Sequence, residues 1–207
     1  LAMVPKTHIP NYQEFYEARR FEPAPKKNLI IDFFGNQVPF GTKYIFASTT
    51  NENFRFGIEI CEDLWLPDSP SINLALNGAN IILNPSASNE ITTKSDYRRS
   101  LVTIQSAKLV CGYVYCNAGD GESTTDVVFS GHHLICENGT IINESHGFES
   151  ELIYGDLDLK KLASERRKMT TYKTRHDYEM IYFESTDIDL DTTYYYDPHP
   201  FVPSNHS

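Results

Sequence analysis

The sequence predicts an α/β fold built on a mixed sheet. Residues 54–60 alternate apolar and other side chains, as strands do, and residues 79–84 form a second apolar strand. Between them, residues 69–76 fit a short helix that ends at Asn77 and Gly78. The pair Asn138 and Gly139 lies between two apolar runs and predicts a hairpin. Parallel and antiparallel strands are therefore both expected.

The other elements follow from the same periodicities. Residues 95–110 fit a helix capped by Ser95, with Tyr97, Leu101 and Ile104 on one face, and residues 113–117 fit a third strand. We also expect a short helix within residues 12–22, hairpin strands at 127–136 and 140–143, a strand at 152–157, and a closing helix at 159–169 that turns Leu162 and Met169 inward.

Composition limits the classes of partner. The chain has 207 residues, of which 40% are hydrophobic and 22% are charged, enough for one sizeable core. Its net charge of -10 argues against a nucleic-acid partner and against an anionic membrane surface. No apolar run approaches the ~20 residues of a membrane span, and residues 1–10 lack the layout of a signal peptide. Small molecules or proteins are the expected partners.

The cysteines indicate a reducing compartment. Cys61, Cys111, Cys116 and Cys136 lie in apolar, strand-like runs rather than at the turn-bounded spacings of a disulfide framework. Cys111 and Cys116 have no second pair at zinc-site spacing, so we expect no bound metal. A cytoplasmic location follows from this usage.

Two features bear on domain organisation. Residues 1–4 look like the end of a buried strand, so we expect Leu1 to be an internal residue of a longer polypeptide. Periodicity ends at Lys173, after which come an acidic, tyrosine-rich stretch at 187–197 and a proline-rich stretch at 198–203. We therefore divide the chain into one domain at 1–173 and a linker or arm at 174–207.

Cys61 is the candidate nucleophile. It ends a predicted strand and precedes a helix-forming segment, the position where α/β sheets hold their ligands. Its thiolate would need a nearby cation, which Lys6 could supply, or a base. Taken singly, a buried structural cysteine and a solvated lysine are the commoner interpretations. A cysteine–histidine enzyme is also open, and the candidate bases, which have no distinctive spacing, are His8, His132, His133 and His146.

Several strings resemble one family. Residues 4–17, which contain Lys6, resemble the catalytic-lysine segment of the nitrilase superfamily of carbon-nitrogen hydrolases, in the form found in the glutaminase domains of NAD synthetases. Residues 57–65 resemble its nucleophile segment. Further matches lie at 84–90, 113–115 and 121–126, of which the Gly-Glu-Ser-Thr-Thr-Asp string at 121–126 is the most specific. Residues 200–203 resemble the segment that leads into the synthetase domain.

The resemblance covers nearly the whole chain and implies a fold and a reaction. The fold is a partial nitrilase-like αββα sandwich of four layers. The reaction is glutamine hydrolysis, in which Cys61 attacks the side-chain amide and releases ammonia through a thioester. The resemblance implies that Lys6 stabilises the oxyanion and that the backbone N–H of Glu62 is the second donor.

Further roles are carried over from the same family. Tyr12 and Ser88 align with residues that hold the amino-acid end of glutamine. Lys94 aligns with the family's arginine at this end, and a lysine keeps the charge but loses the two-pronged grip on a carboxylate. Glu14, eight residues after Lys6, aligns with the second glutamate of the superfamily.

The general base is the main departure from the family pattern. The family's catalytic glutamate precedes the lysine, in a strand that this sequence does not contain, and neither Glu14 nor Glu59 substitutes for it. We therefore expect the isolated 207-residue chain to release no glutamate from glutamine. Measurable glutamate release by the purified chain would contradict this expectation.

The resemblance also implies partners. These are glutamine, a synthetase domain in the same polypeptide that amidates deamido-NAD, and further copies of the chain in a homo-oligomer. ATP and Mg²⁺ would belong to the synthetase domain, and no cofactor is expected in this chain. Two alternatives remain: a stand-alone nitrilase-type amidase, and a non-catalytic assembly domain of the same fold.

Overall fold

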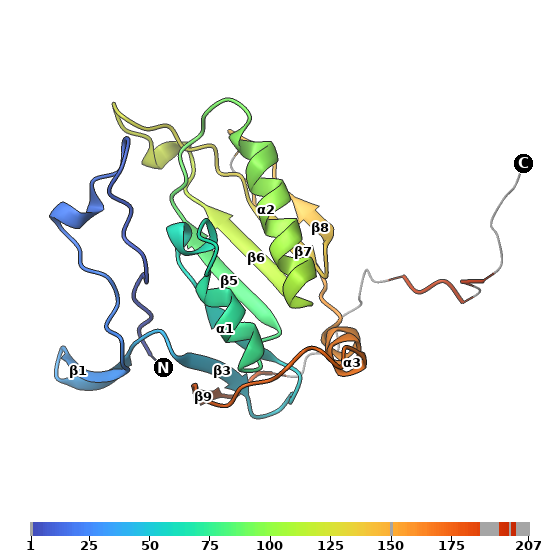
Figure 1. Cartoon of the computed structure of the whole chain (residues 1–207). Coiled ribbons are helices and arrows are strands. Elements are labelled where there is room, and N and C mark those ends of the chain that lie inside the picture. The colour runs from blue at the N-terminus through green and yellow to red at the C-terminus, as the bar shows by residue number, and fades with distance from the viewer. Residues whose placement is uncertain (1, 150, 187–194, 199, 202–207) are drawn as a thin grey trace, which may run out of the picture.

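The computed structural model describes residues 2–149, 151–186, 195–198, 200 and 201. Figure 1 shows a sheet that carries helices, with a short separate hairpin beside it. The elements are η1 (Glu17–Arg19), β1 (Leu29–Phe33), β2 (Asn36–Phe40), β3 (Tyr44–Ser48), β4 (Arg55–Ile58), η2 (Cys61–Leu64), α1 (Pro70–Leu76), β5 (Ile81–Ser86), α2 (Lys94–Leu109), β6 (Gly112–Asn117), η3 (Asp120–Glu122), β7 (Leu134–Glu137), β8 (Thr140–Glu144), α3 (Leu159–Lys168) and β9 (Glu179–Phe183).

The main sheet is mixed, as predicted. Within the described residues it has seven strands in the order β8-β7-β6-β5-β4-β3-β9. β4, β5 and β6 are parallel to one another, and β6, β7 and β8 are antiparallel. The predicted hairpin is confirmed, because Glu137 pairs with Thr140 across the turn formed by Asn138 and Gly139, which both have positive φ. β1 and β2 form a separate two-stranded hairpin.

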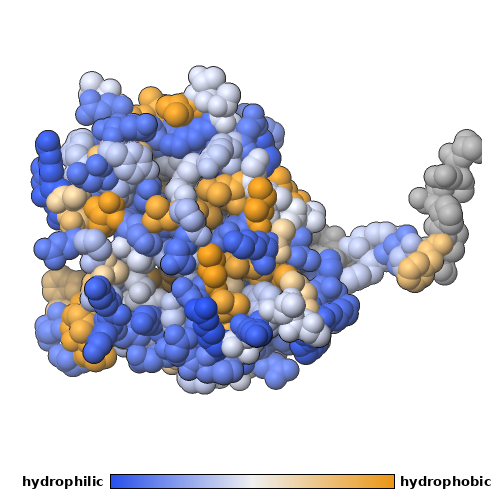
Figure 2. All heavy atoms as spheres, viewed as in Figure 1, coloured by the Kyte–Doolittle hydropathy of each residue, from blue (hydrophilic) through white to orange (hydrophobic). Residues whose placement is uncertain are grey.

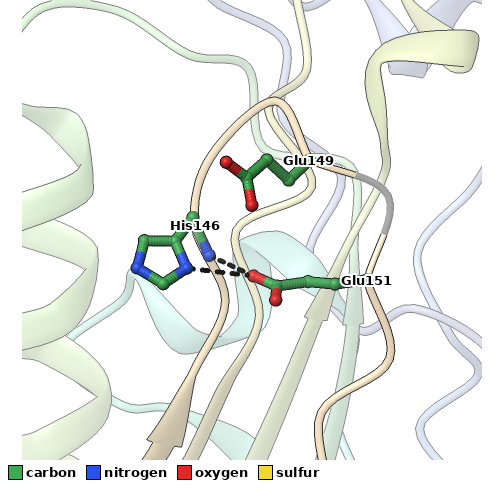
Figure 3. A group of neighbouring side chains, drawn as sticks. All are labelled: His146, Glu149 and Glu151. Atoms are coloured by element: carbon green, nitrogen blue, oxygen red, sulfur yellow. Dashed lines mark hydrogen bonds and ion pairs between the residues drawn. The ribbon is translucent and has the colours of Figure 1, made fainter.

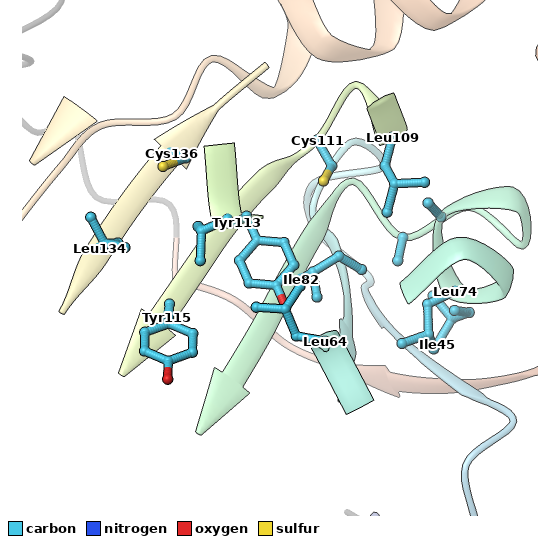
Figure 4. Close-up of a cluster of buried hydrophobic side chains, with 13 residues drawn as sticks. Ile45, Leu64, Leu74, Ile82, Leu109, Cys111, Tyr113, Tyr115, Leu134 and Cys136 are labelled. Atoms are coloured by element: carbon cyan, nitrogen blue, oxygen red, sulfur yellow. The ribbon is translucent and has the colours of Figure 1, made fainter. Parts of the chain in front are cut away.

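Helices α1 and α2 pack on one face of the sheet, and the hydrophobic core lies between them and the strands (Figure 4). Tyr113 and Tyr115 of β6 point into this core together with Ile82 of β5. The sheet and α1 approach closely at Gly57 of β4, where a Cβ atom would lie 2.8 Å from Cδ2 of Leu74. Glycine is therefore required at this position for close packing.

The apolar face predicted for α2 is not its buried face. Tyr97 and Ile104 are 59% and 62% exposed, and the buried residues of the helix are instead Arg98, Val102, Ser106 and Leu109. Figure 2 shows the side of the molecule that carries α1 and α2, where apolar residues interrupt a largely hydrophilic surface. The buried stripe of α2 includes two polar residues, Arg98 and Ser106. A prediction from hydrophobicity alone therefore selects the neighbouring, more apolar stripe. The helix also begins at Lys94 rather than after a Ser95 cap.

Three other predictions need correction. Residues 152–157 form no strand, because this segment is held by side-chain bonds, such as that from Asn143 Nδ2 to the Tyr154 carbonyl (2.8 Å), rather than by a backbone ladder. Met169 lies beyond the end of α3 and is exposed, although Leu162 is buried as expected. Regular structure also continues past Lys173, since β9 extends the sheet by pairing in parallel with β3.

Some predicted elements are shorter than expected. Within residues 12–22 the structure has the single turn η1, and within 127–136 the strand β7 begins only at Leu134. Met3 makes an isolated bridge to Phe40, while Leu1 lies outside the described residues. Much of the tyrosine-rich and proline-rich arm, at 187–194, 199 and 202–207, also lies outside them, so the division at Lys173 stays a prediction.

Among the described residues, the helices are too short and too polar to cross a lipid bilayer.

Candidate active site

The site lies where the parallel strands end. β4, β5 and β6 run in the same direction, so their carboxyl ends meet at one edge of the sheet. Cys61 follows β4, Ser88 follows β5, and Asn117 ends β6. Side chains that are distant in the sequence are thus brought to one edge by the register of the strands.

Cys61 is the first residue of the 3-10 turn η2, which follows β4. Its φ is +51°, in the left-handed region that a residue with a Cβ atom rarely adopts. Its backbone N–H donates to Oδ1 of Asn84 (3.1 Å) on the neighbouring strand. Cys61 is a half-buried free thiol. Such a conformation must be maintained by its surroundings, and it is typical of functional positions.

A pocket of about 350 Å³ opens at this turn. Cys61 and Glu62 contribute to its wall, as do aromatic side chains that include Phe15 and Trp65. The remaining sequence-predicted residues on its wall are Tyr12, Glu14, Ser88 and Lys94. The structure therefore gathers six of the seven predicted site residues around one cavity, and Lys6 is the exception.

Tyr12 and Glu62 are paired at the mouth of the pocket. The Tyr12 hydroxyl donates to Oε1 of Glu62 (2.8 Å). Burial, together with this hydrogen bond and the charge of Glu62, raises the pKa of Tyr12 to about 12. Tyr12 thus remains a protonated donor over the whole neutral range. Within the described residues, the backbone N–H of Glu62 donates to no protein acceptor, so it is free to bind a ligand.

Lys94, on the wall of the pocket, is held by aromatic and polar neighbours. Its Nζ lies 5.4 Å from the ring centroid of Trp65 and 5.9 Å from that of Phe15. It donates to Oδ1 of Asn89, whose Nδ2 donates to Glu14 (2.5 Å). Burial lowers the pKa of Lys94, and the charge of Arg98 lowers it further. Asn89, which connects Lys94 to Glu14, was not among the predicted site residues.

Ser88 is fixed by the neighbouring strand. Its N–H donates to Oδ1 of Asn117 (2.8 Å), and Nδ2 of Asn117 donates back to the Ser88 carbonyl (3.0 Å). The NH2 group of Arg98, a fully buried residue of α2, donates to the Ser88 hydroxyl (3.4 Å). The position of Ser88 is therefore set by two residues that periodicity alone did not identify.

Lys6 does not line the pocket in this structure. Its Nζ forms an ion pair with Oε2 of Glu17 (2.7 Å), and its side chain is largely buried. Glu14, which aligns with the second glutamate of the superfamily, lines the pocket and accepts a hydrogen bond from Asn89. Glu17 was not predicted, because a charge near a lysine in sequence is not by itself a signal of pairing.

Asp63 joins the Lys6 segment to the Cys61 turn. It is 1% exposed, and its carboxylate accepts the backbone N–H groups of Thr7 (3.2 Å) and His8 (2.8 Å). The same carboxylate accepts the N–H of Ile60 (3.0 Å), the residue before Cys61. One buried carboxylate thus ties both functional segments together. Its place two residues after Cys61, within the nucleophile segment at 57–65, is the signal that could have identified it.

None of the four histidines considered as bases lines the Cys61 pocket. His8 bonds Asp63, His133 accepts the N–H of Asn117, and His132 bridges Arg98 and Glu144. Burial lowers the pKa of both His132 and His133. The geometry gives no support to a cysteine–histidine pair.

His146, Glu149 and Glu151 gather on the surface (Figure 3). One ligand atom from each lies within 4.8 Å of the others. His146 and Glu151 already contact each other, with Nδ1 and Oε1 3.4 Å apart, and His146 is largely exposed. We assign no ion to this cluster, because exposed acidic groups commonly gather without one.

The fold and the cysteine site together define a class of enzyme. Residues 2–167 match the model of the carbon-nitrogen hydrolase family, so the chain belongs to that family. The expected nitrilase-superfamily fold is therefore confirmed. Among the described residues, this fold is represented by the mixed seven-stranded sheet and the helices that pack on it.

Within that family, the chain is similar to glutamine-dependent NAD(+) synthetases. The enzyme of Mycobacterium tuberculosis strain H37Rv is 38% identical over 196 residues, which cover 92% of this chain and 29% of that protein. The Thermotoga maritima enzyme is 31% identical over 161 residues, covering 77% and 24%. The chain therefore spans less than a third of the length of these relatives.

Solved structures agree with the sequence relatives. A glutamine-dependent NAD(+) synthetase from Cytophaga hutchinsonii superposes with a TM-score of 0.57 at 29% identity, covering 68% of this chain and 22% of that one. A carbon-nitrogen hydrolase from Helicobacter pylori G27 gives a TM-score of 0.60 at 19% identity, covering 79% and 54%. At that identity the second likeness shows the fold alone.

The Asp63 carboxylate provides a test of how the site is assembled. We expect Asp63→Asn to lower the free energy of unfolding by about 1–3 kcal/mol, because the new amide group faces N–H donors that then lack an acceptor. Urea unfolding of the full-length protein measures the loss. The exposed Asp68→Asn is the matched control and should stay within about 0.5 kcal/mol of the wild type. Equal stabilities for the two variants would contradict the role given to Asp63.

Proposed function

We propose that this chain is the glutamine amidohydrolase part of a glutamine-dependent NAD synthetase. The observation that carries the proposal is the strained turn of Cys61, which opens into a pocket shared with Tyr12, Ser88 and Lys94. The similarity to proteins named glutamine-dependent NAD(+) synthetase supports the choice of glutamine among small amides.

The proposed reaction has two halves. The Cys61 thiolate attacks the side-chain carbonyl carbon of glutamine and gives a tetrahedral oxyanion. The oxyanion collapses, the C–N bond breaks, and the nitrogen leaves as ammonia after taking up a proton. Water then attacks the resulting thioester and releases glutamate and the free thiol. The half-buried position of Cys61 suits this reaction, because the sulfur is reachable but largely shielded from solvent.

Two donors are assigned to the oxyanion. The backbone N–H of Glu62, which follows the nucleophile and is unpaired within the described residues, is the first. Lys6 is the second, and its support is the Asp63 carboxylate, which fixes the next two residues, Thr7 and His8, beside the Cys61 turn. Such a donor lowers the barrier by about 3 kcal/mol in a preorganised site. For Lys6 to act, its ammonium group must share or leave the ion pair with Glu17.

The other pocket residues are proposed to bind the amino-acid end of glutamine. The Lys94 ammonium group would pair with the α-carboxylate, and its aromatic neighbours keep water away from this ion pair. Tyr12 and Ser88 supply further polar groups on the wall. Glu14 acts through Asn89, which orients Lys94.

The general base is not assigned to a residue of this chain. Glu59 is only two residues from Cys61, but it is 1% exposed and its carboxylate is occupied by hydrogen bonds from Tyr113, Ser69 and Ser71. It does not line the pocket. We propose, from the family resemblance, that the base belongs to a strand that precedes Lys6 in the longer polypeptide.

For the whole protein, we propose that ammonia from this site passes to a synthetase domain that uses ATP and Mg²⁺ to amidate deamido-NAD. A homo-oligomer and a cytoplasmic location belong to the same proposal. The free thiols of Cys61, Cys111, Cys116 and Cys136 support a reducing compartment.

A glutamine-mimicking electrophile tests the nucleophile. In the full-length protein we expect it to modify Cys61, because the pocket presents the amide analogue to that sulfur, and peptide mapping by mass spectrometry locates the adduct. Cys61→Ala should abolish both labelling and glutamate release. The exposed Cys116 is the matched control, so Cys116→Ala should keep both.

Labelling at Cys116, or no labelling with glutamine left intact, would instead support a non-catalytic assembly domain. Selective labelling of Cys61 combined with faster hydrolysis of another small amide would support a stand-alone amidase.

The lowered pKa of Lys94 gives a pH dependence. A lysine is charged below its pKa, and burial moves that pKa below its ordinary value of 10.5. The KM for glutamine should therefore rise as the pH increases through this lowered value, at a lower pH than for an exposed lysine. In Lys94→Arg the rise should move to higher pH, because a guanidinium group stays protonated. Steady-state assays at a series of pH values measure KM for the wild type and for Lys94→Arg. Identical dependence of KM on pH in the two proteins would rule out a role of Lys94 in substrate binding.

A further inference from the structure

A buried hydrogen-bonded chain runs from the backbone of Cys61 to a carboxylate. The Cys61 N–H donates to Oδ1 of Asn84 (3.1 Å), and Nδ2 of Asn84 donates to the Tyr113 hydroxyl (3.0 Å). The Tyr113 hydroxyl then donates to Oε1 of Glu59. The chain crosses three neighbouring strands, because Glu59 follows β4, Asn84 is in β5 and Tyr113 is in β6.

The direction of every bond in this chain is determined by its first member. A backbone N–H can only donate, so the oxygen of the Asn84 amide faces Cys61 and its NH₂ group faces Tyr113. The tyrosine oxygen accepts that bond and must therefore direct its own proton to Glu59. Burial raises the pKa of Tyr113 well above its ordinary value, which keeps this proton in place.

Glu59 ends the chain as an acceptor. Its second oxygen, Oε2, accepts the Ser69 hydroxyl (2.7 Å) and the backbone N–H of Ser71 (2.7 Å) at the start of α1. Burial raises the pKa of Glu59, and the hydrogen bonds from these donors act in the opposite direction by favouring the carboxylate. Glu59, Asn84 and Tyr113 are each no more than 1% exposed, so solvent does not compete for their bonds.

The chain acts on the residue whose backbone is strained. Cys61 has a φ of +51°, and the bond from its N–H to Asn84 is the contact that turns this peptide group toward the sheet. With that N–H turned inward, the next one, that of Glu62, is left unpaired within the described residues. The same bond therefore affects both the direction of the Cys61 sulfur and the position of the proposed oxyanion donor.

We propose that Glu59, Tyr113 and Asn84 are positioning residues for the nucleophile, which hold the Cys61 turn in the conformation that aims the sulfur and the Glu62 N–H at one substrate carbon. This inference rests on the proposed function, since it names residues that act on the same reaction through Cys61.

Tyr113→Phe in the full-length protein tests the proposal, because it removes one hydroxyl and preserves the packing of the ring. We expect kcat for glutamine hydrolysis to fall by about tenfold to 100-fold, the cost of a small misplacement of reacting groups, while KM for glutamine changes less than twofold. Alkylation of Cys61 by iodoacetamide, followed against pH, should change its rate or midpoint as well. A tyrosine that only fills the core would alter neither.

Tyr172→Phe is the matched control. Tyr172 also donates a buried hydrogen bond, to the Leu109 carbonyl (2.9 Å), at the end of α2 away from the carboxyl edge of the sheet. Its loss should leave kcat unchanged. A Tyr113→Phe protein with wild-type kcat, or with a loss equal to that of Tyr172→Phe, overturns the proposal.

A double-mutant comparison tests the connection within the chain. If Glu59 acts through Tyr113, then Glu59→Gln combined with Tyr113→Phe should lower kcat little more than the stronger single variant. Independent, multiplying effects would show that Glu59 does not act through Tyr113 and would overturn that step. Should Tyr113→Phe not fold, Ser69→Ala decides, with a fall in kcat of about threefold supporting the proposal and an unchanged kcat overturning it.

Cys61→Ala separates this proposal from the one it rests on. If Cys61→Ala still hydrolyses glutamine, the proposed function fails. If Cys61→Ala is inactive while Tyr113→Phe matches the wild type, only the positioning role fails.

Discussion

The carboxylate of Asp63 is the contact on which the candidate site depends. It joins chain segments that are 55 and 56 residues apart in sequence by accepting the N–H groups of His8 and Thr7. It also accepts the N–H of Ile60 at the entrance to the Cys61 turn. Because the carboxylate is buried, leaving any of these donors unpaired would be costly. The segment that carries Lys6 is therefore held against the Cys61 turn by these hydrogen bonds.

Buried charges recur around this edge of the sheet. Glu59, Asp63 and Arg98 are each no more than 1% exposed, and all three have polar partners. Such networks favour one arrangement over its alternatives, because most of their donors and acceptors must be paired at once. Of the guanidinium nitrogens of Arg98, only Nε has no acceptor among the described residues. A core of aliphatic side chains alone would pack the helices on the sheet equally well, but it would not fix the orientation of individual peptide groups. In this site, buried polar groups fix the orientation of peptide groups, and the apolar core holds the helices on the sheet.

The fold was predictable where its signals are local. The strand ending near Cys61, the helix α1 and the hairpin at Asn138 depend on periodicity and turn residues within a few positions. The buried face of α2 was not predictable, because Arg98 is buried through partners elsewhere in the chain, among them Glu90 and His132. β9 was missed for a related reason, since its short alternation becomes a strand only by pairing with β3.

The residues of the site also fall into two groups, those that the sequence predicts and those that only the tertiary structure brings together. Cys61 could be found from its place after a strand, and the roles of Tyr12, Ser88 and Lys94 came from family strings. The ion pair of Lys6 with Glu17 and the bridging position of Asn89 could not be predicted, since a long polar side chain has many partners within reach and only the tertiary structure selects one.

The stacking of Trp65 has an optical consequence. Trp65 is the single tryptophan of this chain, and it lines the Cys61 pocket. Its ring stacks on that of Tyr97, with the centroids 5.5 Å apart, and its centroid lies 5.4 Å from Nζ of Lys94. Indole emission is sensitive to a nearby charge and to the exclusion of water. The molecule therefore carries an intrinsic fluorophore inside its candidate site, and occupancy of the pocket can be followed by light without any added label.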